Sequence, residues 1–98
     1  MDILSYLDTW ISQHTADLSA AGLKTDIRRT PTDVERPAIV LDLDSETRIG
    51  RITVWSNGDC NLEAMDAQSG QILLFEHTEI TSRQVFENCI NKLLHHMK

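Results

Sequence analysis

The first twenty residues carry an apolar stripe at helical spacing. Its members recur at three- and four-residue steps and so fall on one face of a helix: Ile3, Leu7, Trp10, Ile11, His14 and Leu18. Asp2 can cap the start of this helix, and Gly22 stands where a left-handed residue would end it. An amphipathic helix has to bury its apolar face, so we expect it to pack on a sheet.

Two strand patterns follow the helix. Apolar and polar positions alternate over residues 23–29 and again over 38–44, where Ile39, Leu41 and Leu43 share one face. Residues 30–37 between them are expected to form a loop, because their two prolines cannot donate ladder hydrogen bonds. A polar turn at 44–46 leads into the central part of the chain.

The central hairpin admits two registers, and the buried face selects one. A two-residue turn would set the apolar Val54 opposite the polar Asn61. A three-residue loop over 56–58 instead sets Val54 opposite Cys60 and keeps one face apolar. That loop needs a left-handed residue, which Gly58 supplies. Because a slip of one residue turns every side chain to the other face, we predict the three-residue loop.

The last strand pattern, residues 71–77, follows a second glycine-containing turn. It is apolar on both faces, with Ile72 and Leu74 expected on one and Leu73 and Phe75 on the other. This pattern suits an interior strand, or a strand whose second face meets something else.

A second amphipathic helix closes the chain. Thr81 is expected to cap it, with Gln84 reaching back as in a capping box. Its apolar face consists of Val85, Phe86, Cys89, Ile90, Leu93, Leu94 and Met97. The pattern therefore predicts an α+β fold: an N-terminal helix, a five-stranded antiparallel meander and a C-terminal helix, with both helices on one face of the sheet.

Composition narrows the class of protein. At 98 residues, 41% hydrophobic and 24% charged, residues 1–98 are expected to form one folded domain. The net charge of −6 argues against a nucleic-acid or anionic-membrane partner and is compatible with a basic protein partner. Solubility alone would explain the same charge. The chain lacks an apolar stretch of membrane-spanning length and the basic start of a signal peptide, so we expect a cytoplasmic protein.

Candidate chemistry is sparse. Cys60 and Cys89 lie on apolar faces without metal-type spacing, which predicts buried free thiols. We expect no metal, no cofactor and no catalytic residue, because phosphate loops, HExxH and Gly-x-Ser-x-Gly are missing. An acid–base site built from Glu76, His77 and Glu79 is the weakest hypothesis, since neighbours in a strand point to opposite faces.

The outer face of the hairpin is the better candidate for binding a protein. Arg51, Trp55 and Glu63 should project from it together with Ile49 and Met65, and exposed Trp, Met and Arg are enriched at protein interfaces. Asp42, Asp44 and Asp59 could form an acidic rim around this face, with Glu46 and Asp66. The alternatives are a mixed outer face without a partner, packing of Trp55 against the 30–37 loop, and a merely solvated rim.

Residues 50–80 carry a family resemblance that covers about a third of the chain. Its features are the run Gly50-Arg51-Ile52-Thr53-Val54-Trp55, then Gly58, Glu63, the Asp66-x-x-Ser-Gly70 turn and Glu76-His77. In these features the chain resembles the TriTu family of bacterial immunity proteins. Thr78 stands where the family pattern has a second histidine, which weakens any role for a histidine pair.

The resemblance implies a function. Such proteins resemble antidotes to Rhs-type toxins delivered by type VI secretion, and the implied toxin is an ADP-ribosyltransferase that modifies elongation factor Tu. The antidote would bind the toxin domain one to one and block its NAD or substrate cleft, with the free protein a monomer. The alternative is a secretion chaperone or adaptor, which would dimerise and hold an effector segment.

Overall fold

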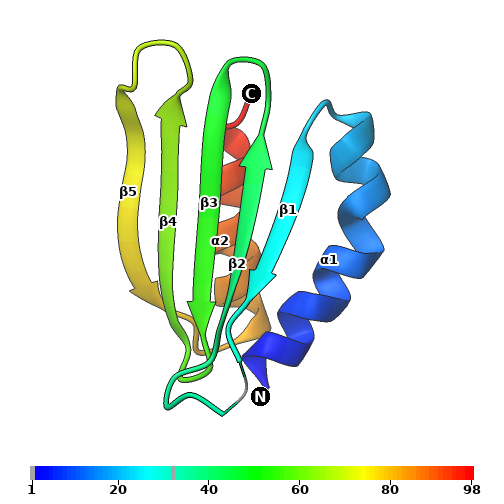
Figure 1. The fold of residues 1–98 in the computed structure, drawn as a ribbon, viewed down its shortest axis with the longest axis vertical. Coiled ribbons are helices and arrows are strands. Elements are labelled where there is room, and N and C mark those ends of the chain that lie inside the picture. The colour runs from blue at the N-terminus through cyan, green and yellow to red at the C-terminus, as the bar shows by residue number, and fades with distance from the viewer. Residues whose placement is uncertain (1, 32) are drawn as a thin grey trace.

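The chain folds into a five-stranded antiparallel sheet with one helix before it and one after it (Figure 1). The computed structural model describes residues 2–31 and 33–98. The elements are α1 (Ile3–Ala20), β1 (Lys24–Arg29), β2 (Ala38–Asp44), β3 (Arg48–Trp55), β4 (Asp59–Asp66), β5 (Ile72–Glu79) and α2 (Arg83–His95). Met1 and Thr32, the latter in the predicted 30–37 loop, lie outside the described residues. The predicted order of elements is confirmed.

The central hairpin has the predicted register. Val54 pairs with Cys60 across β3 and β4, and Gly58 closes the three-residue loop at φ 95°. The Gly58 N–H donates to the Trp55 carbonyl over 2.9 Å. The strands form a meander in chain order, so β1 and β5 are the two edges of the sheet.

The predicted alternation of β5 is wrong at its first residues. The register shifts at Ala64/Met65, so that Met65 pairs with Ile72 while Ala64 pairs with Leu74. Because of this β-bulge, Leu73 has no partner residue on β4. Ile72 therefore lies on the face of Phe75, and not, as expected, on the face of Leu74.

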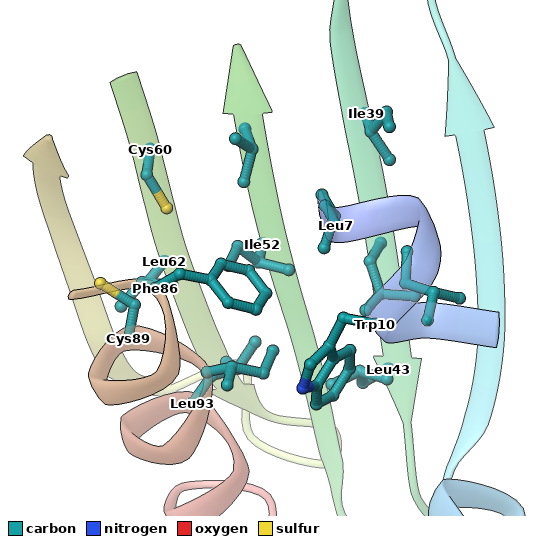
Figure 2. Packing of buried hydrophobic residues seen from close by; sticks show 14 of the residues in the cluster. Leu7, Trp10, Ile39, Leu43, Ile52, Cys60, Leu62, Phe86, Cys89 and Leu93 are labelled. Carbon is teal, nitrogen blue, oxygen red and sulfur yellow. The ribbon is translucent and has the colours of Figure 1, made fainter. Parts of the chain in front are cut away.

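Both helices cover the same face of the sheet, as predicted. In Figure 1, α2 lies behind the centre of the sheet and α1 lies beside β1. Figure 2 shows Leu7 and Trp10 of α1 and Phe86 of α2 gathered over the strands, where Ile52 and Leu62 are almost completely buried. The Trp10 and Phe86 rings meet edge to face with centroids 5.9 Å apart. Each such side chain contributes roughly 1.5–3 kcal/mol by burial.

The start of α1 follows the predicted chemistry, whereas the capping box predicted for α2 is wrong: Gln84 donates to Asn88 over 2.9 Å and does not reach back. The Asp2 carboxylate accepts from the Ser5 N–H over 3.2 Å and caps α1, as expected. The cap of α2 is Ser82 and not Thr81, because the Ser82 hydroxyl accepts from the Val85 N–H over 3.2 Å.

Both cysteines are free and buried, as predicted. Cys60 points from β4 into the helix–sheet interface, where Cys89 of α2 also lies (Figure 2). Burial raises the pKa of the Cys60 thiol to about 12, and the neighbouring Cys89 adds to the shift. Burial also raises the pKa of Cys89. Both thiols therefore stay protonated at neutral pH.

Candidate protein-binding face

The sheet face turned away from the helices, called the outer face below, brings most of the predicted site residues together. Antiparallel pairing places Asp42, Arg51, Glu63 and Phe75 in one row that crosses β2, β3, β4 and β5. A neighbouring row consists of Asp44, Ile49, Met65 and Ile72. Cross-strand neighbours in such rows are close enough for their side chains to interact.

Asp42 is the centre of a small charge network. Its carboxylate accepts from Arg51 over 2.6 Å and from Arg28 over 2.8 Å, and its side chain is 16% exposed. The hydrogen bond to Asp42 raises the pKa of Arg51 above its usual value. Asp42 is thus already paired with two arginines of the same chain, and it fixes the direction of the Arg51 guanidinium.

Trp55 and Asp59 both contact Arg36, which lies in the loop between β1 and β2 in the sequence. The Arg36 guanidinium lies 5.3 Å from the centre of the Trp55 ring and donates to Asp59 over 2.7 Å. Trp55 is consequently half-buried. Packing against this loop was one of the alternatives for Trp55, and the structure shows it through Arg36.

The acidic rim is largely paired with arginines. Asp66 bonds to Arg48 over 3.0 Å. It also accepts from the backbone N–H groups of Ser69 and Gln68, which lower its pKa. Asp44, at the end of β2, and Glu46, in the following turn, are exposed. The outer face therefore carries less free negative charge than the sequence suggests.

The outer face has an apolar corner in which Ile49 and Met65 were expected, whereas Ile72 and Phe75 were not assigned to the site. Phe75 is 72% exposed, Ile72 65% and Ile49 42%. Together with Met65 they border a hollow of about 290 Å³, which Arg51 and Glu63 also line. The signal was the strand pattern of residues 71–77, apolar on both faces, and the bulge adds Ile72 to the exposed side. An exposed apolar group of this kind makes the corner a candidate interaction surface.

The residues of the acid–base hypothesis do not converge. Glu76 faces the helices, where its carboxylate accepts from Lys92 over 2.9 Å and 3.1 Å. His77 is on the opposite face and contacts Asn61 over 2.6 Å. Among residues 2–31 and 33–98, no group of three or more acidic, histidine or cysteine side chains is placed to hold a metal ion.

The fold defines a class: a small α+β domain with both helices on one face of its sheet and the other face uncovered by them. The family model for the immunity protein TriTu matches residues 5–96, which is nearly the whole chain. The chain belongs to this family of immunity proteins, and the resemblance is confirmed. Among curated proteins none matches the chain. Neither helix in the described part of the chain has the length and apolar character needed to cross a membrane.

Proposed function

We propose that the chain neutralises a bacterial ADP-ribosyltransferase toxin by binding its catalytic domain through the outer face of the sheet. Membership of an immunity-protein family supports a toxin partner. The observation that carries the choice of face is the apolar corner, where Phe75 and Ile72 are mostly exposed beside Arg51 and Glu63. An exposed aromatic and an aliphatic side chain framed by charges are typical of the centre of a protein interface.

The predicted residues take distinct roles in this proposal. Arg51 and Glu63 lie next to the apolar corner and would give the interface its polar contacts. Trp55 and Asp59 would form its border with Arg36. Asp42 would act by holding Arg51, and Asp44 would lie at the margin. Charged groups arranged in this way give specificity and a fast encounter more than affinity.

Neutralisation would proceed by occlusion of the toxin's NAD or substrate cleft, without chemistry by the antidote. One antidote molecule would then be needed for each toxin molecule. An enzyme that reversed the modification would protect at far lower amounts. A titration of toxin activity against antidote concentration separates the two, and inhibition that ends at a ratio of one to one is the expected outcome.

The first experiment is co-purification of the tagged protein with the toxin domain encoded beside it, in a catalytically weakened form. We expect a stable one-to-one complex and a monomeric free protein by sedimentation. The absence of any complex would overturn the proposal, and a stable homodimer would favour the secretion chaperone instead.

Two variants locate the interface within that complex. Glu63→Arg combined with Trp55→Ala should weaken binding and protection of toxin-expressing cells by at least about tenfold. Asp17→Arg makes the same change of charge as Glu63→Arg, at an exposed position of α1. Its binding to the toxin domain should stay within about threefold of that of the wild type. Unchanged protection by the double variant would place the interface elsewhere.

A further inference from the structure

We propose that the toxin is held by strand addition: an extended segment of the partner pairs with the free edge of β5 and continues the sheet. This inference rests on the proposed function and names the mode of binding. It is based on a difference between the two edges of the sheet, the strands β1 and β5.

The β1 edge is protected. Its sequence, Lys24–Arg29, is mostly charged or polar, and charged side chains are a common means of blocking an edge. Helix α1 lies beside it (Figure 1), tied by an ion pair between Asp8 and Arg29. A strand that approached this edge would have to displace the helix and bury several charges.

The β5 edge is open, and its first half, residues 72–75, is apolar. β5 is the last strand of the sheet, and Phe75, which projects from it, is one of the most exposed large apolar residues described. The bulge at Ala64/Met65 affects only its first residues, so the regular stretch runs from Leu74 to Glu79. An edge of this kind is a template for pairing unless a partner covers it.

The hydrogen-bonding groups of this edge can be assigned from the register. The Ile80 N–H donates to the Gly58 carbonyl over 2.8 Å, so residue 80 points its backbone groups at β4. Successive residues of an antiparallel strand alternate in this respect. The N–H and C=O groups of Phe75, His77 and Glu79 therefore point away from the sheet, where an added strand would meet them.

The side chains of the same three residues describe the partner. All of them lie on the outer face, where a paired strand would place every second side chain. The segment that fits has an apolar side chain opposite Phe75, extending toward the hollow of about 290 Å³. It has a basic side chain opposite Glu79, which is exposed. Affinity would come from the main chain and specificity from these two positions.

Charge disfavours a second copy of this chain as the occupant. Two copies paired through β5 would bring two molecules of net charge −6 together, with no lysine or arginine on the outer face of β5 to oppose Glu79. A toxin segment with basic and apolar side chains would pair with the backbone of the β5 edge and would match the Phe75 and Glu79 side chains on the outer face.

The test uses a backbone variant with a matched side-chain control, and the catalytically weakened toxin domain as the probe. His77→Pro removes an N–H that points outward, so the β4–β5 ladder stays intact, and edge strands tolerate proline. We expect it to weaken binding at least about tenfold. His77→Ala removes the same side chain but keeps the N–H, so it should weaken binding clearly less than His77→Pro does. Equal effects of the two variants would overturn strand addition.

Hydrogen exchange in the wild-type complex gives a second readout that needs no variant. The amides of Phe75, His77 and Glu79 should exchange quickly in the free protein and at least about tenfold more slowly in the complex. The outward amides of Thr25 and Ile27, at the β1 edge, should not change.

If a complex forms while the β5 amides stay fast, strand addition fails and the proposed function stands. If no complex forms, the proposed function itself fails. Protection of these amides in the free protein at high concentration would identify a second copy as the occupant and overturn the proposal.

Discussion

Gly50 has no room for a side chain, because Leu93 of α2 and Met97, just after α2, lie close to its backbone. A Cβ atom added there would lie 2.5 Å from the Met97 sulfur and 3.4 Å from the Leu93 side chain. We expect Gly50→Ala to destabilise the protein by about 1–3 kcal/mol, as overpacking of a core does. The cost should be smaller in the background of Met97→Ala, because the atom that is crowded has been removed. Urea unfolding of the four proteins in a double-mutant cycle measures this coupling. Strictly additive effects would contradict the close approach.

Cys60 links stability to alkaline pH. Its pKa of about 12 in the folded protein exceeds the ordinary 9.0, so the folded state keeps a proton that the unfolded state releases. The stabilisation is complete below pH 9 and is lost as the pH rises toward 12. Over this window the wild type should lose up to about 1.4 kcal/mol per pH unit more than Cys60→Ala. Urea unfolding at a series of pH values measures both slopes, and equal slopes would contradict the shift.

Single residues also mark the limits of sequence reasoning. The three-residue loop at Gly58 was predictable because only one register keeps Val54 opposite an apolar partner. The position of Trp55 was left open, because its contact with Arg36 depends on how a loop distant in sequence folds back. Phe75 was placed on a strand with the correct side-chain alternation, but its exposure depends on β5 being an edge.

At the level of elements, the start of α2 distinguishes two neighbouring hydroxyl residues. Ser82→Ala should destabilise the protein by about 1 kcal/mol, because the Val85 N–H loses its acceptor. Thr81→Ala, one residue earlier, should stay within about 0.5 kcal/mol of the wild type. Thermal unfolding of both variants gives the comparison. A larger effect at Thr81 would show that Thr81, the residue favoured by the sequence pattern, caps α2.

The elements themselves were largely predictable, and their edges were not. Alternation and helical spacing are local properties, so the order of two helices and five strands follows from the sequence. A bulge depends on the fit between two strands, and the alternation of β5 alone contains no sign of it. Ile72 was therefore assigned to the wrong face, which hid one of the four residues of the apolar corner. The cap of α2 was misplaced by one residue because Thr81 and Ser82 are chemically equivalent candidates.

For the whole molecule, the net charge of −6 has a kinetic consequence in the proposed complex. A basic partner would be attracted before contact, and salt screens attraction between exposed charges. Between about 0.02 M and 0.5 M salt, the association rate constant with the toxin domain should fall at least about tenfold. The dissociation rate constant should change much less. Surface plasmon resonance separates the two constants, and a salt-independent association rate would contradict the attraction.

The division of the sheet into two faces determines how this protein can change through evolution. The residues that hold the fold together point toward the helices, whereas Arg51, Glu63, Ile72 and Phe75 point away from them. Substitutions on the outer face can therefore accumulate without disturbing the core. In the proposed complex, a lineage whose toxin acquires a new surface would follow it by altering this one face, while the scaffold beneath stays the same.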